Sequence, residues 1–397
     1  ARAGRELGRA LYWSRRAEEA VAALAAALAE PGLDEALRLR LEAELTMNAA
    51  RIPSQHEEAL RRLAAVEADA GAGPGARMLL VLKAYAAAAQ GEGREQAAAW
   101  AEEAFAAMPK EERAWSYVGG LYALLFADRL EEGLRVIDGT LADARRRGAA
   151  FAVSGMLLMR TIFGYARGTL AEAEADARMA LEALPHREAL FMPHVHGWLI
   201  QVLVERGEPA EAVALLEALE ADVGPFPEDF AHAPLLRARG VVAAARGDHA
   251  TALADQLALG RVLAALSHHN PAVSSPGWRS EAALAHHALG DDEAALALAR
   301  EEVELARAWG APRPLGRALR VLGLVEGGAE GIERIAEAVA LLDGSPARLE
   351  HAYALADLGA ALRRANRRAE AREHLRAGLG LAQRCGAGRL ARRAHEE

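Results

Sequence analysis

Short amphipathic runs of apolar and polar residues recur along the whole chain, and each follows a glycine or a polar turn. Near the start of each run an acidic or polar residue is followed by Ala or Gly, at intervals of 36 to 42 residues. These small residues are Ala20, Ala59, Ala97, Gly133, Ala173, Ala212, Ala252, Ala294, Gly331 and Ala371. Ten copies at such a period are typical of an array of stacked helix pairs.

One helix pair cannot bury its own apolar face, so neighbouring pairs must stack to build a continuous core. Ala, Leu, Arg and Glu dominate the composition and favour helix. Aromatic residues make up only 5% of the chain, and no β-branched alternation indicates strands. The sequence therefore predicts an all-α protein: a tetratricopeptide-like superhelix (an α-solenoid) of about ten antiparallel helix pairs, forming one array over residues 1–397.

Glycine turns divide the two helices of several pairs, because glycine ends one helix and an Asp or Pro starts the next. The pattern predicts helices over 150–166, 170–184, 187–206, 210–221, 233–246, 250–266, 279–289 and 293–309. Three connections are longer than stacking requires, at Asp222–Pro234, Ser267–Trp278 and Gly310–Gly316. Such loops either gather along a binding edge or act as hinges, and a hinge would lie near 222–234 or 267–278.

The formal net charge of −9 gives the chain no general attraction to nucleic acid or to anionic lipid. One late segment is nevertheless basic, since residues 363–393 contain ten arginines and two acids, Glu370 and Glu373. This segment either contacts a neighbouring domain or nucleic acid phosphates, or is a solvated helix face. We expect no direct nucleic acid contact by this chain.

The single cysteine, Cys385, excludes an internal disulfide and a thiolate zinc site, which fits a reducing compartment. No apolar run reaches the ~18 residues that a membrane span needs. The first residues are not followed by the apolar region of a signal peptide. We therefore expect a cytoplasmic protein without a membrane partner. The chain does not begin with Met, so it is compatible with a piece of a longer protein.

Sequence motifs for catalysis are missing. The chain has no G-x-x-x-x-G-K-[ST], H-E-x-x-H or G-x-S-x-G, and its carboxylates lie beside arginines, as on solvated helix faces. We expect no enzymatic activity and no cofactor, although sequence leaves open two carboxylates facing each other in a cleft.

Histidines occur in close pairs, at His194/His196, His268/His269 and His286/His287. A metal site needs several ligands that converge, whereas residues two apart on a helix point to different faces. We therefore expect no metal site, and place these histidines at helix starts, in loops and on the surface.

Aromatic residues are unevenly distributed: thirteen of nineteen lie between Trp100 and Phe230, mostly on the first helices of pairs four to six. First helices of such arrays usually line the concave side, and aromatic walls with a few polar groups are typical of small-molecule sites. Arg160 stands in an apolar run, where a buried charge needs a partner. The candidate ligand-binding residues are Tyr117, Tyr122, Arg160, His194 and Trp198. The alternative is that these aromatic residues only fill the core.

The last hundred residues carry more specific features than periodicity. These are Asn270–Val273, Trp278–Ala285, Arg307–Arg313, Arg320–Gly327, Ser345–Glu350, Ala354–Arg364 and Arg392–Glu397. Over residues 270–397 the chain resembles the helical region of large ATP-binding transcription regulators of the LuxR family, and over 1–269 it is similar in architecture alone. In that family a P-loop ATPase precedes the tetratricopeptide-like array, and a LuxR-type helix-turn-helix follows it.

The resemblance implies a sensor role for this chain, which would bind a small-molecule inducer or a regulatory protein or peptide and pass that event to flanking ATPase and DNA-binding domains. The motifs of both flanking domains are missing here, so no residue is assigned to ATP or DNA binding. The alternative is a free-standing scaffold of tetratricopeptide type, whose groove holds a protein segment.

Overall fold

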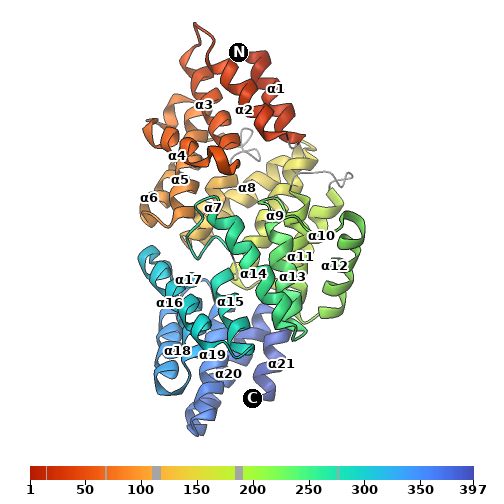
Figure 1. Cartoon of the computed structure of the whole chain (residues 1–397), viewed down its shortest axis with the longest axis vertical. Coiled ribbons are helices and arrows are strands. Elements are labelled where there is room, and N and C mark those ends of the chain that lie inside the picture. The colour runs from red at the N-terminus through yellow and green to blue at the C-terminus, as the bar shows by residue number, and fades with distance from the viewer. Residues whose placement is uncertain (15, 68, 110–117, 184–190, 275–276) are drawn as a thin grey trace. The chain divides into compact units, whose positions relative to one another are not determined.

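The computed structural model describes residues 1–397 apart from 15, 68, 110–117, 184–190 and 275–276. All regular structure in this described part is helical (Figure 1). The odd-numbered helices are α1 (Arg2–Trp13), α3 (Glu35–Ala49), α5 (Pro74–Gln90), α7 (Val118–Phe126), α9 (Ala150–Arg167), α11 (Met192–Arg206), α13 (Ala233–Ala245), α15 (Trp278–Ala288), α17 (Pro312–Glu326), α19 (Arg348–Arg364) and α21 (Gly388–Glu396).

The even-numbered helices are their partners in the hairpins. They are α2 (Ala17–Leu28), α4 (His56–Ala65), α6 (Arg94–Ala107), α8 (Leu130–Arg146), α10 (Leu170–Ala183), α12 (Pro209–Val223), α14 (His249–Ala264), α16 (Asp292–Trp309), α18 (Gly328–Leu342) and α20 (Arg368–Cys385). Two 3₁₀ helices, η1 (Pro53–Gln55) and η2 (Ala70–Ala72), lie in connections. The prediction of an all-α tetratricopeptide-like solenoid is confirmed, with α21 following the tenth pair.

The repeated small residue marks the same place in every pair. It is the fourth residue of each even-numbered helix, from Ala20 in α2 to Ala371 in α20, and it is buried. The eighth pair corrects the sequence reading by one position, because the buried residue there is Ala295, the fourth of α16, whereas Ala294 is only half-buried. A small side chain is needed here because the two helices of a pair approach each other closely.

The ninth pair shows how close this approach is. A Cβ added to Gly331 of α18 would lie 2.3 Å from the carbonyl oxygen of Gly323 in α17. A Cβ on Gly323 would lie 2.5 Å from the carbonyl oxygen of Gly331. The backbones of α17 and α18 therefore touch directly, and any larger residue at either position would force the helices apart.

The turns within pairs follow the predicted chemistry. Gly207 between α11 and α12 has φ +84°, and Gly290 between α15 and α16 has φ +82°. Asp128 and Asn366 take the same left-handed conformation in the α7–α8 and α19–α20 turns, at φ +60° and +61°. Asp and Asn tolerate this region better than most residues, so two pairs form without glycine there.

One predicted connection is wrong. Residues 310–316 are not a long loop, since α17 begins at Pro312 and only Gly310 and Ala311 separate it from α16. Pro312 is the first residue of α17 and Pro314 lies in its first turn, where the backbone N–H groups have no intrahelical partner and proline is tolerated. The other two connections persist, between α12 and α13 and between α14 and α15.

The chain divides into two compact units. Unit 1 comprises Ala1–Met156 and Leu263–His268, and unit 2 comprises Leu157–Pro185, Phe191–Val262 and His269–Glu397. The continuity of the array over 1–397 and the hinge near 222–234 or 267–278 stay predictions. Each unit is described by itself below.

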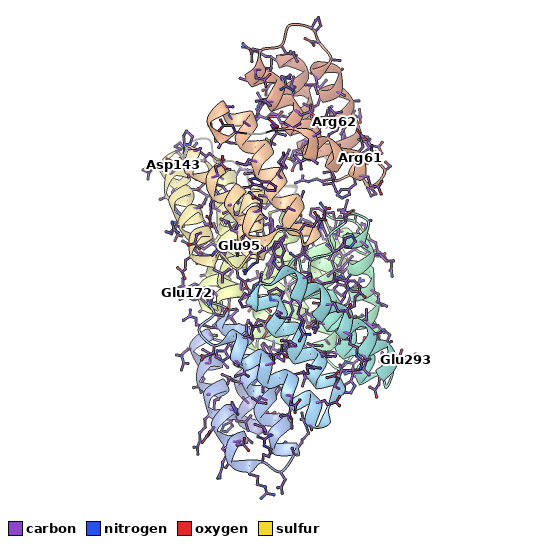
Figure 2. The ribbon with its side chains drawn as sticks, turned by 90° about the vertical axis from the view of Figure 1, so that its left-hand side faces the viewer. Arg61, Arg62, Glu95, Asp143, Glu172 and Glu293 are labelled. Carbon is purple, nitrogen blue, oxygen red and sulfur yellow. The ribbon has the colours of Figure 1, made fainter. Side chains whose placement is uncertain are left out.

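Many charged side chains on the even-numbered helices point to solvent. Arg61 of α4, Glu95 of α6, Glu172 of α10 and Glu293 of α16 are all exposed (Figure 2). Among the helices that the structure describes, none is long and apolar enough to cross a membrane. The polar groups that are buried lie mainly on the odd-numbered helices, and they form the candidate site.

Candidate ligand-binding face of unit 2

The odd-numbered helices of unit 2 carry rows of large polar and aromatic side chains at helical spacing. Positions three or four apart lie on one face of a helix, so each row faces one way. The rows are Trp198, Gln201 and Glu205 on α11, Arg313, Arg317 and Arg320 on α17, and Glu350, Tyr353 and Asp357 on α19. All except Tyr353 are buried. We call these three rows the inner face of unit 2.

Glu205 joins three helices at one carboxylate. Its Oε2 accepts a hydrogen bond from the Tyr353 hydroxyl at 2.5 Å, and its Oε1 accepts one from Arg389 Nη2 of α21 at 2.9 Å. Arg389 Nη2 also donates to the Tyr353 hydroxyl oxygen at 2.8 Å. The pKa of Arg389 is raised well above its usual range by Glu205 and Tyr353, and burial raises the pKa of Tyr353. Arg389 is therefore cationic and Tyr353 neutral at neutral pH.

Asp357 forms a second junction one helical turn away. It accepts hydrogen bonds from Arg320 Nη1 of α17 and Arg393 Nη2 of α21, both at 2.8 Å. The guanidinium carbons of Arg320 and Arg393 lie 5.1 and 5.5 Å from the centroid of the Tyr353 ring, within cation–π distance. Asp357 and Tyr353 thus fix α17 and α21 to α19.

The end of the chain packs back on α9 and α11. Arg392 of α21 donates to the carbonyl oxygen of Gly207 at 3.1 Å, and Arg348 of α19 donates to that of Arg167 at 3.3 Å. A Cβ on Gly388 would lie 2.3 Å from the carbonyl oxygen of Arg206, so α21 begins directly against the end of α11. Within unit 2, helices more than 180 residues apart in sequence are therefore in contact.

Arg317 is the most deeply buried cation of the inner face, with a side chain that is 0% exposed. Its Nη2 donates to the carbonyl oxygen of Pro271 at 2.9 Å, and its guanidinium lies 3.7 Å from Glu302 and 3.6 Å from Glu350. Its Nε and Nη1 make no hydrogen bond with any described residue. A buried donor without an acceptor is costly, so these N–H groups are available for a water molecule or for an oxygen of a ligand.

Glu281 of α15 lies within the electrostatic reach of Arg317, Arg320 and Arg389. Burial raises the pKa of its carboxyl, and the three arginines oppose that rise. The residue is half-buried, in contrast to the fully buried acids Glu302 and Asp357. Glu281 is therefore the acid of this cluster that solvent still reaches.

An aromatic region adjoins these charges on α9, α11 and α13. The rings of Tyr165 and Trp198 meet edge to face with centroids 5.4 Å apart, and the Arg237 guanidinium carbon stacks 4.1 Å from the Trp198 ring centroid. Burial raises the pKa of Tyr165, with Glu205 adding to the rise and a hydrogen bond with Gln201 opposing it. The inner face thus combines apolar rings with oriented hydrogen-bonding groups, as ligand sites do.

The predicted site residues do not all lie together. Trp198 belongs to the inner face, being 5% exposed. Arg160 of α9 makes a two-point ion pair with Asp176 of α10, at 2.7 Å from Nε and 2.5 Å from Nη2, within its own helix pair. The His194 ring lies 6.2 Å from that of Phe230.

Of the other two predicted residues, only Tyr122 is described, and it is not on the inner face of unit 2. Tyr122 lies in unit 1, with its ring 6.2 Å from Tyr85 and 5.7 Å from Phe126. Tyr117 lies outside the described residues. The assignment of all five residues to a ligand site stays a prediction.

The paired histidines have individual surroundings. His286 and His287 lie 3.0 and 2.7 Å from the carboxylates of Asp291 and Asp292, and His268 Nε2 lies 3.3 Å from the Tyr85 hydroxyl. In the part of the chain that the structure describes, no three His, Cys, Asp or Glu side chains are grouped closely enough to hold a metal ion.

Arginines of the basic segment 363–393 are used within the chain. Arg389 and Arg393 bond Glu205 and Asp357, and Arg367 bonds Glu370 on the surface. These contacts favour an internal role for these arginines over a phosphate-binding one.

Sequence reasoning missed the polar rows on α17 and α19. Arg313, Arg317 and Arg320 show the same i, i+4, i+7 spacing as a core stripe, which is unusual for arginine. That spacing was the available signal, since a charged stripe at core positions predicts an internal polar surface. Aromatic enrichment directed attention to pairs four to six instead.

Comparison with known proteins bears on the fold. No protein-family model matches the sequence, and no curated protein matches it. The chain is similar in structure to a Rap protein complexed with competence and sporulation factor, with a TM-score of 0.61 and 11% identity over 88% of this chain and 99% of that one. At that identity the likeness concerns the fold alone.

Two other solved structures align less well and carry no argument. The apo form of the quorum sensor NprR from B. thuringiensis has a TM-score of 0.46 at 16% identity, over 88% of this chain and 99% of that one. Aspartyl phosphate phosphatase F from Bacillus subtilis has a TM-score of 0.44 at 12% identity, over 89% and 96%.

Proposed function

We propose that this chain is a ligand- or partner-sensing helical-repeat region of a LuxR-family transcription regulator. In this role the inner face of unit 2 binds a small-molecule inducer or a regulatory protein or peptide. The change is then passed to flanking ATPase and DNA-binding domains of the full-length protein. The observation that carries the proposal is a set of buried polar groups, on and next to α11, α17 and α19. Some of their N–H donors have no acceptor among the described residues.

Three arginines provide these donors. Arg317 Nε and Nη1, Arg320 Nε and Arg389 Nε are buried and make no hydrogen bond with the residues that the structure describes. A face built only to hold the helices together would match these donors, because each unmatched one costs about 1–3 kcal/mol. Oxygen atoms of a ligand, such as the carbonyl groups of a peptide or a small carboxylate, complete the face.

Two further observations support a sensing role. Residues 270–397 resemble the helical region of the LuxR-family regulators, and the Rap protein of similar fold was solved in complex with competence and sporulation factor. Arg389 and Arg393 of α21 also bond Glu205 and Asp357 of the inner face. A ligand that changes the contacts of these two acids would therefore act directly on α21.

Ligand screening on the intact chain tests this proposal. We expect some members of small-molecule and peptide libraries to raise the melting temperature, because a ligand that binds only the folded state stabilises it. Amide hydrogen exchange then locates each hit. The proposed face requires slower exchange in α11, α17, α19 and α21, and hits that protect only even-numbered helices would contradict it.

A pair of arginine variants sharpens the test. Arg320→Met removes an inner-face donor, whereas Arg372→Met removes an exposed arginine of α20. The first is expected to weaken binding of a hit by at least about tenfold, and the second to leave it unchanged. Equal loss in both variants would mean that general charge, and not this face, binds the ligand.

The alternative is a free-standing scaffold of tetratricopeptide type that holds a segment of another protein on the same face. The fold itself favours this reading, since helix-pair arrays present extended binding surfaces. The coding sequence on both sides of this region distinguishes the two. A P-loop upstream and a helix-turn-helix downstream support the regulator, and their absence from the full gene supports the scaffold.

The proposal includes no catalysis and no specific DNA binding by this chain, and it places the protein in the cytoplasm. The missing nucleotide-binding motifs, the net charge of −9 and the single cysteine motivate these expectations. ATP hydrolysis by the purified chain, or DNA binding that persists at about 200 mM salt, would contradict them.

A further inference from the structure

Arg51 of unit 1 has surroundings unlike those of most arginines in the chain. It follows α3 and is exposed to solvent. One of its guanidinium nitrogens, Nη1, donates a hydrogen bond to the hydroxyl of Tyr12 in α1, and its guanidinium carbon lies 5.1 Å from the Tyr12 ring centroid. No carboxylate among the described residues forms an ion pair with it.

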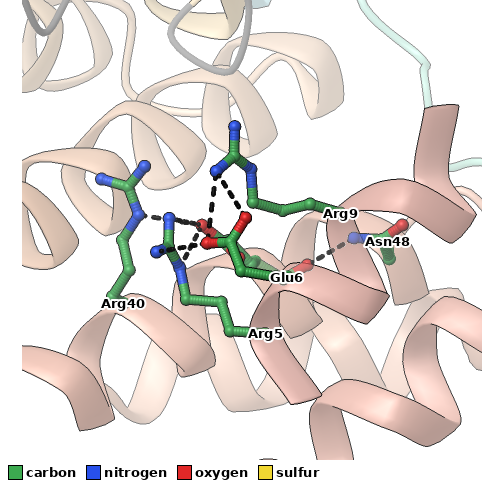
Figure 3. A network of polar contacts seen from close by, with 6 residues as sticks. Arg5, Glu6, Arg9, Arg40 and Asn48 are labelled. Carbon is green, nitrogen blue, oxygen red and sulfur yellow. Dashed lines mark hydrogen bonds and ion pairs between the residues drawn. The ribbon is translucent and has the colours of Figure 1, made fainter. Parts of the chain in front are cut away.

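The preceding turns of α3 provide the contrast. Arg5 of α1 and Arg40 of α3 converge on one carboxylate, that of Glu44, at 2.9 Å each (Figure 3). About two turns further along α1, Tyr12 meets Arg51, which follows α3, and no described acid forms an ion pair with Arg51. Arg5 and Arg40 therefore hold helices together through a carboxylate, whereas Arg51 forms no ion pair with a described carboxylate.

Two further tyrosines act on Arg51 from the next odd-numbered helices. The surrounding protein partly desolvates the exposed Arg51 side chain, which tends to lower its pKa, while Tyr12, Tyr85 of α5 and Tyr122 of α7 raise it, and the net direction is upward. The rings of Tyr85 and Tyr122 lie 6.2 Å apart in an edge-to-face arrangement. The guanidinium thus contacts Tyr12 directly and lies within the electrostatic reach of Tyr85 and Tyr122.

These tyrosines do not neutralise the arginine at physiological pH. Tyrosine is uncharged below about pH 10, and burial raises the pKa of Tyr85 further. The Tyr85 hydroxyl is positioned by His268, with 3.3 Å between its oxygen and Nε2 and with the two ring centroids 5.5 Å apart. The result is a positive charge beside tyrosine hydroxyl groups and aromatic rings, to which no described carboxylate is bonded as an ion-pair partner.

We propose that Arg51, Tyr12, Tyr85 and Tyr122 form a binding site in unit 1 for an organic carboxylate that carries an aromatic ring. The carboxylate supplies the missing counter-charge to the planar guanidinium, which suits two-point hydrogen bonding to an anion of that shape. The ligand ring packs edge to face with Tyr85, Tyr122 and Phe126, whose centroids are 5.7 to 6.4 Å apart. This site stands independently of the function proposed for unit 2.

The chemistry of the site favours a carboxylate over a phosphate. One arginine and neutral hydroxyl groups balance a single negative charge, whereas a phosphate dianion usually needs further cations or backbone N–H groups. The carboxylate comes from either of two sources, a free small molecule or the C-terminus of a peptide that ends in an aromatic residue. The same pair of groups, a ring and a carboxylate, is recognised in both.

Calorimetric titration of the intact chain at low ionic strength tests the site, since added salt screens an exposed charge. The probes are phenylacetate, its charge-reversed counterpart 2-phenylethylammonium, inorganic phosphate, and a tripeptide ending in Phe with a free or an amidated C-terminus. We expect phenylacetate to bind and 2-phenylethylammonium not to bind. Preferential binding of the free-acid peptide over phenylacetate would identify a peptide terminus as the source, and the reverse order a small molecule.

Matched variants connect that binding to Arg51. Arg51→Met is expected to weaken phenylacetate binding by about tenfold to a hundredfold, the loss of a charge-assisted pair. Arg51→Lys keeps the charge and is expected to lose less. Arg61→Met, which removes an exposed arginine of α4 in the same unit, is expected to have no effect.

Three results would overturn the site. They are equal binding by wild type and Arg51→Met, tighter binding of phosphate than of phenylacetate, or no phenylacetate binding up to about 10 mM. Circular dichroism of each variant shows that it is folded before titration, and Arg51→Lys gives the answer if Arg51→Met fails to fold.

Discussion

Two clusters of arginine and tyrosine on odd-numbered helices differ in one component. In unit 2 the Tyr353 hydroxyl lies between Arg389 and the carboxylate of Glu205, and each charge has an opposite partner. In unit 1 the Tyr12 hydroxyl accepts from Arg51, and no described carboxylate forms an ion pair with that arginine. The same two residue types therefore give a closed junction in one unit and an open, positively charged surface in the other.

The two clusters differ in whether a carboxylate pairs with the arginine, and this difference determines whether the arginine is neutralised within the protein. A carboxylate that is 5% exposed, as Glu205 is, must be paired, and its partners fix α11, α19 and α21 together. Arg51 is exposed, so water compensates its charge until an anion displaces it. A junction of the first kind contributes to stability, and a surface of the second kind contributes to binding. Four variants test this division, from the largest expected effect to the smallest.

Trp198→Ala is expected to have the largest effect. The side chain is 5% exposed and packs between Tyr165 and the Arg237 guanidinium, so its removal leaves a large cavity. We expect the free energy of unfolding to fall by about 3–5 kcal/mol, measured by urea denaturation. Leu289→Ala, at a 50% exposed position of the same unit, is the control and should change stability by less than about 0.5 kcal/mol. Near-normal stability with loss of a ligand response would instead make Trp198 a binding residue.

Glu205→Ala should have the next largest effect. It leaves Arg389 without its carboxylate and removes the acceptor of the Tyr353 hydroxyl, so we expect a loss of about 3 kcal/mol. Glu208→Ala, at an exposed position just beyond α11, should be near neutral. In the Glu205→Ala background, Arg389→Met should cost little or restore stability, because the unpaired cation is removed. Equal, additive losses would show that the two residues are not coupled.

The fold was predictable because its signal is local and repeated. The small residue recurs at the fourth position of each even-numbered helix, where two helices of one hairpin touch, and only neighbouring sequence is needed to see it. The single slip, from Ala295 to Ala294, arose because two alanines stand side by side and the helix start decides between them. The 310–316 loop was predicted wrongly because Pro312 and Pro314 also fit the first turn of a helix.

The polar clusters were not predictable in the same way, because they join distant positions. Glu205 and Arg389 are 184 residues apart, and Arg51 meets Tyr12 from 39 residues away. Periodicity indicates which face of a helix is internal, but it does not tell which residue of another helix lies opposite. Arg160 shows this limit. The sequence predicted that its charge needs a partner, but it did not identify that partner as Asp176 of the adjacent helix.

Glu281→Gln tests the open acid of unit 2 through pH. Burial raises the pKa of Glu281 above the ordinary value of 4.5, so the folded state binds a proton more tightly than the unfolded state. Its contribution to stability is therefore fully present below 4.5 and is lost as pH rises through the folded-state pKa. On going from pH 4.5 to pH 7 the wild type should lose the stability that protonated Glu281 provides, and the variant should not. The free energy of unfolding at pH 7 minus that at pH 4.5 should therefore be larger in Glu281→Gln than in the wild type. An unchanged difference would mean that Arg317, Arg320 and Arg389 fully offset the burial.

Arg51→Met should change stability least, and for that reason it is the sharpest test of the comparison. The variant loses the hydrogen bond to Tyr12 and the contact with its ring, but it also removes a cation that no carboxylate balances. These opposing terms should leave the free energy of unfolding within about 1 kcal/mol of the wild type, measured by urea denaturation. Arg5→Met in the same unit removes one of two partners of buried Glu44 and should cost more. If Arg51→Met is the more destabilising of the two, Arg51 is a structural residue and unit 1 holds a junction like that of unit 2. If Arg51→Met changes stability little and abolishes carboxylate binding, the charge of Arg51 functions in ligand binding.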